Sequence, residues 1–175
     1  MAARRALVLG GTGMLSGVAD ALLVDGWQVV LPSRRKPTVD GRAARWVKAD
    51  WTEPATLAAT AAEALGGPAD LLVAWVHRGV RMSVLRAVAP LLADDAPVVE
   101  VHGSASANPL GGCPEPVLTG HPTQQVVLGY VRHAGRTRWL THDEVSAGVL
   151  DAVHRALDGK PPHVHQVGEF RPVHD

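Results

Sequence analysis

The chain has little of several features that would define its function at once. It holds a single cysteine among 175 residues, which excludes an internal disulfide and a cysteine-based zinc site. Lysine plus arginine equals aspartate plus glutamate at 17 each, so the formal net charge is zero. No apolar run is long enough to span a bilayer. We therefore expect neither nucleic acid nor membrane as a partner.

Disorder is also excluded, because 46% of the residues are hydrophobic and only 19% are charged. This length and hydrophobicity suit one compact domain over residues 1–175 with a substantial core. The first residues only faintly imitate a signal peptide, since glycines interrupt their apolar run, so we expect a cytoplasmic protein.

Short apolar runs alternate with segments of helical apolar spacing. Strands are predicted at 6–10, 27–31, 45–50, 69–76, 97–102 and 124–131, with a short last strand at 163–167. Helices are predicted at 14–25, 52–65, 84–92 and 141–157, the last one starting with the capping box Thr141-x-x-Glu144. This order predicts the α/β class: a doubly wound parallel sheet (Rossmann fold) of six to seven strands with helices on both faces.

A glycine-rich turn joins the first predicted strand to the first predicted helix. It comprises Gly10, Gly11, Thr12, Gly13, Met14 and Leu15. Glycine lets such a turn be tight and lets backbone N–H groups approach a pyrophosphate, while the helix N-terminus favours the anion. The position between strand and helix therefore predicts dinucleotide binding. The alternative is a tight turn without a ligand.

The residues at the end of the second predicted strand indicate which dinucleotide the protein binds. NAD binders usually carry an acidic residue there, but this chain has Ser33, Arg34 and Arg35. Arginine can grip a 2′-phosphate with two hydrogen bonds, so we expect NADP(H) instead of NAD(H). The alternative is a solvated basic loop. Asp50 and Trp51 follow the third strand, where such folds contact adenine, although Asp50 could equally cap a helix.

With these residues in place, the chain resembles the short-chain dehydrogenase/reductase superfamily over most of its length. The resemblance is firmest at residues 10–15, and residues 138–148 are similar to small, stand-alone bacterial members. It implies the fold and the cofactor more firmly than the reaction. The superfamily's usual catalytic Tyr-x-x-x-Lys is missing, because the single tyrosine is Tyr130 and position 134 is alanine.

Proton transfer must then come from other groups beyond the carboxyl ends of the strands. His77 follows the fourth predicted strand, His102 ends the fifth, and Ser104 matches the superfamily's catalytic serine by position. These three are the catalytic candidates. A hydrogen-bonded structural histidine is the alternative for His77, and a turn residue is the alternative for Ser104.

Other polar residues support weaker expectations. His121 and Gln125 follow a long loop at 103–122, where substrate contacts would be expected, whereas Tyr130 is expected in the core. His163 and His165 would share one strand face, but no third ligand is implied, so we expect no metal. A further set could hold an anionic substrate or form a solvated hairpin: Arg132, Arg136 and Arg138.

Together these observations favour a small, atypical NADP(H)-dependent oxidoreductase that transfers hydride to or from a small carbonyl, imine or alkene substrate. Two alternatives stay open: a non-catalytic NADP(H)-binding sensor or regulatory protein, and a non-redox isomerase or lyase on the same fold. Homodimers are common among such folds, so a homodimer is a candidate assembly, although the sequence carries no interface signature.

Overall fold

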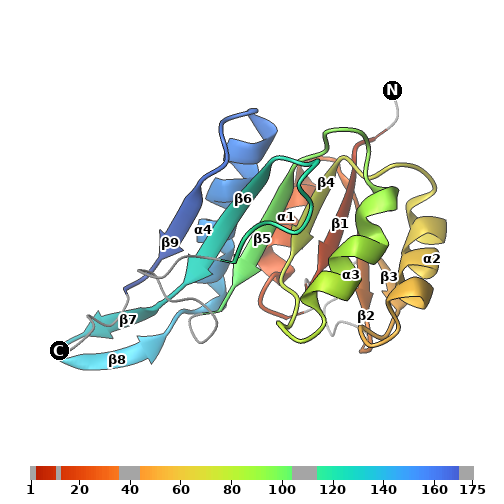
Figure 1. Cartoon of the computed structure of the whole chain (residues 1–175). Helices are drawn as coiled ribbons and strands as arrows, with labels where there is room; N and C mark the ends of the chain where they lie inside the picture. The colour runs from red at the N-terminus through yellow and green to blue at the C-terminus, as the bar shows by residue number, and fades with distance from the viewer. Residues whose placement is uncertain (1–2, 11–12, 36–43, 104–113, 170–175) are drawn as a thin grey trace.

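A seven-stranded sheet dominates the computed structural model, which describes residues 3–10, 13–35, 44–103 and 114–169. The strand order is β3-β2-β1-β4-β5-β6-β9, and every neighbouring pair is parallel (Figure 1). The strands are β1 (Arg5–Leu9), β2 (Gln28–Ser33), β3 (Ala44–Lys48), β4 (Leu71–Ala74), β5 (Val98–His102), β6 (Thr123–Leu128) and β9 (Val164–Val167). The predicted doubly wound parallel sheet is confirmed.

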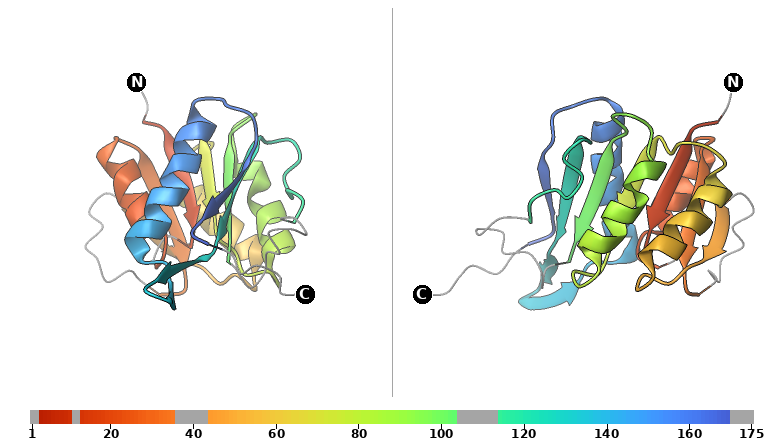
Figure 2. Two further views of the ribbon diagram at one scale, coloured as in Figure 1. Left: turned by 90° about the vertical axis from the view of Figure 1, so that its left-hand side faces the viewer. Right: turned by 45° about the vertical axis from the view of Figure 1, so that its right-hand side comes forward.

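Helices cover both faces of this sheet. They are α1 (Ser16–Val24), α2 (Pro54–Leu65), α3 (Arg81–Val88) and α4 (His142–Leu157), with a 3₁₀ turn, η1 (Ala89–Leu91). Figure 2, left, shows α1 and α4 on one side of the sheet and α3 on the other. Because both faces are covered, central strands such as β4 are wholly apolar and buried. No helix within the described residues is long and apolar enough to cross a membrane.

The sixth strand ends earlier than the predicted 124–131. β6 stops at Leu128, and the chain then enters an antiparallel hairpin of β7 (Tyr130–His133) and β8 (Arg136–Trp139). The physical reason is Gly129, where an added Cβ would lie 2.9 Å from the carbonyl carbon of Glu169. Tyr130 exchanges two backbone hydrogen bonds with Glu169 at 2.7 and 2.9 Å. Its side chain is therefore half-buried at the start of the hairpin, and its predicted place in the core is wrong.

The hairpin projects from the lower left of the sheet in Figure 1. Its turn residues Ala134 and Gly135 both have positive φ, at 51° and 76°, as the common two-residue hairpin turn requires. Arg132 and Arg136 are exposed on its strands. The hairpin alternative for these arginines is therefore the one that the structure shows.

The predicted capping box at the start of α4 is confirmed. Thr141 Oγ1 accepts a hydrogen bond from the Glu144 backbone N–H at 3.1 Å, and Glu144 Oε1 accepts one from the Thr141 N–H at 2.9 Å. Arg138 Nη1 donates to the same carboxylate at 2.7 Å. The Arg138 hydrogen bond first, and the Thr141 N–H second, lower the pKa of Glu144 from 4.5 to about 2.

This lowered pKa predicts an acid-dependent contribution to stability. A carboxyl group whose pKa is lower in the folded state stabilises the fold above its unfolded pKa and loses that effect as the pH falls. We expect Glu144→Gln to lower the Tm at neutral pH, and the difference from wild type to shrink as the pH falls from 4.5 towards 2. Thermal unfolding followed by circular dichroism across this range checks it, with Asp143→Asn as a charge-matched control. A difference that stays constant down to pH 2 would reject it.

Candidate functional site

The glycine turn and His102, both predicted site residues, follow or end strands at the carboxyl edge of the sheet. By register, Leu9, Ala74 and Glu100 form one row across β1, β4 and β5. Gly10 directly follows Leu9, and His102 lies two positions beyond Glu100 on the same strand. The glycine turn and His102 therefore lie at the same edge, where ligands bind in doubly wound sheets.

Gly10 lets the ends of β1 and β4 come together. Its φ is +93°, and an added Cβ would lie 3.0 Å from the Trp75 carbonyl oxygen. The Trp75 N–H donates to the Leu9 carbonyl at 2.9 Å, which holds the two chain segments at this distance. A side chain at position 10 would therefore be strained in conformation and crowded by backbone.

In contrast to Gly10, Gly13 lies in open surroundings. An added Cβ there would meet no described heavy atom within 4 Å, so the backbone of this turn is open to an approaching group. Met14 is half-buried and the Leu15 side chain is fully buried, so both could offer mainly backbone to a cofactor. Gly11 and Thr12, predicted in the same turn, lie outside the described residues.

The N-terminus of α1 faces the same turn without a local anion. Its N-cap is Leu15, no side chain caps the helix, and its first turn holds no acidic residue. Such a helix start favours a bound anion. Gly17, in the first turn of α1, faces Ser146 of α4. An added Cβ at position 17 would lie 2.9 Å from the Ser146 Cβ and closer to its Oγ. The missing side chain thus lets α1 pack against α4.

β2 runs parallel to the adjacent β1, so Arg34 and Arg35 follow β2 at the same edge of the sheet as the glycine turn. Ser33 is buried, and its hydroxyl donates to the Arg35 carbonyl at 2.7 Å while accepting from Trp46 Nε1 at 2.9 Å. Arg34 and Arg35 are exposed. Because its hydroxyl is already engaged, Ser33 orients the turn that carries the arginines. The phosphate contact expected of Arg34 and Arg35 stays a prediction.

Asp50 and Trp51 follow β3, next to the end of β2. Asp50 Oδ1 accepts hydrogen bonds from the Thr52 N–H at 2.9 Å and the Thr52 hydroxyl at 2.7 Å, in the turn before α2. These bonds, and more weakly the charge of Arg34, lower the pKa of Asp50. Trp51 is half-buried against the core beneath α2. The adenine contact expected of this pair stays a prediction.

The catalytic candidates have different surroundings. His77 is exposed, and its Nδ1 accepts a hydrogen bond from the Gly79 N–H at 3.2 Å within a local turn. Ser104 lies outside the described residues. His121 precedes β6 at the amino edge of the sheet, where its Nδ1 donates to the Ala96 carbonyl at 2.8 Å. His121 is therefore not brought to the candidate site.

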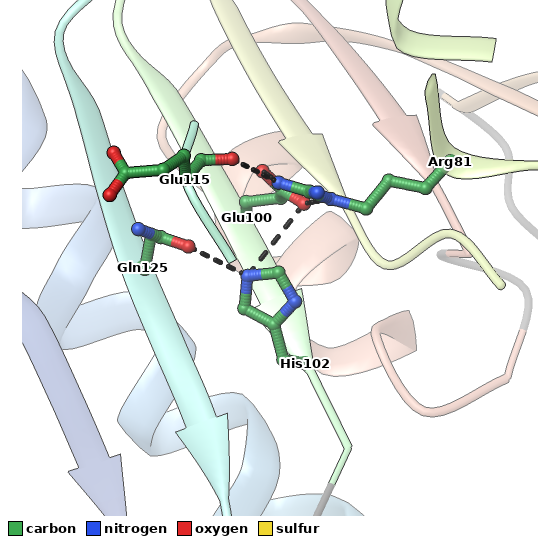
Figure 3. Close-up of polar contacts among 5 residues, drawn as sticks. All are labelled: Arg81, Glu100, His102, Glu115 and Gln125. Atoms are coloured by element: carbon green, nitrogen blue, oxygen red, sulfur yellow. Dashed lines mark hydrogen bonds and ion pairs between the residues drawn. The ribbon is translucent and has the colours of Figure 1, made fainter. Parts of the chain in front are cut away.

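His102 is buried in a polar network that the sequence only partly indicates (Figure 3). Its Nε2 lies 2.8 Å from Gln125 Oε1 and 3.7 Å from Glu100 Oε2. Glu100 forms a two-pronged ion pair with Arg81, whose Nη2 also donates to the Glu115 carbonyl at 2.9 Å. We call Arg81, Glu100, His102 and Gln125 the His102 network.

Two members of this network, Arg81 and Glu100, do not follow from the glycine and basic motifs. A signal for Glu100 is nevertheless present, because it is a carboxylate inside the apolar run of β5. No comparable signal marks Arg81 at the start of α3. A cation there is unfavourable for the helix dipole, so its ion pair with Glu100 explains its position.

His163 directly precedes β9 and His165 lies on this strand; their rings contact each other, and His165 also contacts β6. The His163 and His165 rings meet edge to face with centroids 5.1 Å apart, and His165 Nε2 lies 2.9 Å from Gln124 Oε1. Burial first, and the charge of His163 second, lower the pKa of His165. Within the described ranges, no three His, Cys, Asp or Glu residues are grouped to hold a metal ion.

Comparison with known proteins identifies structures that share this fold. No protein-family model matches the sequence, and no curated protein matches it. Solved structures do match: TT0495 protein from Thermus thermophilus is 21% identical with a TM-score of 0.69, over 94% of this chain and 97% of that chain. A short-chain dehydrogenase/reductase from Burkholderia multivorans with bound NADP is 17% identical with a TM-score of 0.68, over 95% and 96%. An NADH-dependent reductase complexed with NAD is 16% identical with a TM-score of 0.68, over 97% and 98%. The chain therefore has the Rossmann-like fold of short-chain dehydrogenase/reductase structures.

Proposed function

We propose that the protein is a small NADP(H)-dependent oxidoreductase acting on a small carbonyl, imine or alkene substrate. The observation that carries the proposal is the open backbone at Gly13, followed by an α1 N-terminus without a capping side chain or an acidic first turn. This arrangement fits a dinucleotide pyrophosphate. Neighbouring structures of the same fold hold NADP in one case and NAD in another, which supports a nicotinamide cofactor.

Different residues of the chain would bind different parts of the cofactor. The turn at 10–15 would hold the pyrophosphate, Arg34 and Arg35 would hold the 2′-phosphate, and Trp51 would lie near adenine. The bound cofactor supplies or accepts hydride at its nicotinamide ring. His102 would move the accompanying proton, since it lies at the same sheet edge as Gly10 and has a defined polar environment. A sensor would bind the cofactor in the same way without turnover.

The phosphate preference gives a charge-specific test. We expect Arg34→Ala with Arg35→Ala to weaken NADPH binding by about 10- to 100-fold and NADH binding by less than about 2-fold, since only NADPH carries the 2′-phosphate. Fluorescence titration of both reduced cofactors measures this. Arg86→Ala with Lys160→Ala removes the same charge from exposed positions elsewhere and should leave both affinities unchanged. Equal losses for NADPH and NADH would reject the phosphate contact.

A further inference from the structure

The His102 network consists of ionisable and polar side chains, and three of its four members are buried. Glu100 is 3% exposed, while His102 and Gln125 are each 6% exposed. The network lies on the sheet face that carries α3, and its members come from α3, β5 and β6. No residue of the glycine turn or of the basic pair shares its hydrogen bonds in the described chain.

The hydrogen bond to Gln125 determines where the His102 proton lies. An amide oxygen can only accept, so Gln125 Oε1 at 2.8 Å requires an N–H at His102 Nε2. The carboxylate of Glu100, 3.7 Å from the same nitrogen, favours a proton at Nε2 and disfavours a lone pair there. The two neighbours thus agree on the Nε2–H tautomer.

This tautomer determines the role of the other ring nitrogen, Nδ1. Figure 3 shows Nδ1 on the opposite side of the imidazole, turned away from Gln125 and Glu100. In the neutral Nε2–H ring, Nδ1 carries the lone pair and can take a proton. The resulting imidazolium would lie beside the Glu100 carboxylate, whose Oε2 also accepts a hydrogen bond from Arg81 Nε. A carboxylate that orients an imidazole and stabilises its cation is an established arrangement for proton transfer.

We propose that Gln125 and the Arg81–Glu100 ion pair are positioning residues that make Nδ1 of His102 the proton-transferring atom of the site. The proposal rests on the oxidoreductase function above. In the oxidising direction, a bound oxidised nicotinamide would supply the hydride acceptor when the C–H bond of an alcohol substrate breaks. The O–H proton passes to Nδ1, a carbonyl product forms, and the imidazolium then gives its proton to water. Reduction follows the same steps in reverse.

Nuclear magnetic resonance of the ¹⁵N-histidine-labelled chain tests the tautomer without cofactor or substrate. His102→Asn assigns the His102 signals by their loss. In the wild-type chain we expect the neutral His102 ring to give the Nε2–H pattern alone. Gln125→Met removes the hydrogen-bond acceptor and leaves only the Glu100 carboxylate at 3.7 Å, beyond hydrogen-bond distance, so the Nδ1–H pattern should appear beside the Nε2–H pattern. Gln125→Glu keeps an acceptor and should preserve the Nε2–H pattern alone.

Gln124→Met provides the matched control. Gln124 precedes Gln125 on β6 and is also buried, but its amide forms hydrogen bonds with Lys160, Pro161 and His165 instead. This variant should change the His165 signals and leave those of His102 unchanged. A wild-type mixture of both His102 tautomers, or an unchanged Nε2–H pattern in Gln125→Met, would overturn the positioning role.

Turnover separates this proposal from the function on which it rests. With NADPH and a panel of small aldehydes, ketones and imines, Gln125→Met should lower kcat by about 10-fold or more without changing the KM for NADPH, and Gln125→Glu should restore most of it. Absence of NADPH binding in the wild type would reject the oxidoreductase function while the tautomer result stands. Normal turnover with an unchanged pH profile in Gln125→Met and His102→Asn would reject the proton-transfer role while the oxidoreductase function stands.

Discussion

Gly13→Val is expected to weaken NADPH binding by about 100-fold, or roughly 2.7 kcal/mol, while leaving the Tm nearly unchanged. A Cβ at this position meets no described atom within 4 Å, and the residue does not have a positive φ, so the free chain accommodates a side chain. The pyrophosphate, however, must approach the same backbone, and the valine methyl groups would occupy its place. Fluorescence titration and thermal unfolding on the same samples measure both effects.

Gly17→Val is the matched control, because it adds the same side chain four residues later. Here the Cβ would lie 2.9 Å from the Ser146 Cβ, so α1 and α4 must move apart. Overpacking of this kind costs about 1–3 kcal/mol of unfolding free energy. The two valines should therefore separate binding from stability. If Gly13→Val destabilises the chain as much as Gly17→Val and binds NADPH normally, Gly13 does not face the ligand.

Arg81→Met is expected to lower the free energy of unfolding by about 3–5 kcal/mol, because it leaves the Glu100 carboxylate buried without its counter-charge. The Glu100 side chain is only 4% exposed and the Arg81 side chain 12%, so water cannot replace the lost partner. Urea unfolding measures the change. Arg81→Met combined with Glu100→Gln removes both charges and should recover most of the loss.

Arg138→Met offers the comparison at the surface. Arg138 also pairs with a glutamate, at 2.7 Å, but the two side chains are 49% and 36% exposed. Solvent screening makes such pairs contribute much less than a buried pair, so this variant should lower the free energy of unfolding by less than about 1 kcal/mol. A loss in Arg81→Met no larger than that in Arg138→Met would contradict the buried charge pair.

The sheet and the glycine turn could be predicted because their signals are local. Apolar runs of strand length and the glycines at 10–17 each depend on a few neighbouring residues. The end of β6 could not be predicted in this way, because Gly129 breaks the strand through its contact with Glu169, 40 residues later. The same long-range contact explains why the sequence pattern alone predicts Tyr130 in the core and not at the start of a hairpin.

The same distinction applies to the candidate site: residues with a local sequence signal can be predicted, and contacts between distant residues cannot. Arg34 and Arg35 stand out in the sequence, but the engagement of the Ser33 hydroxyl depends on Trp46 from the neighbouring strand. His102 could be predicted from its position at the end of an apolar strand. Its partner Arg81 could not, because only the packing of α3 on β5 brings the guanidinium to Glu100.

The most direct test of this account is the titration of the purified chain with NADPH, followed by the fluorescence of the reduced nicotinamide. The open glycine turn and the two arginines predict saturable binding of one NADPH per chain in the micromolar range, with weaker binding of NADH. Failure of both NADPH and NADH to bind at concentrations up to about 1 mM would contradict the account.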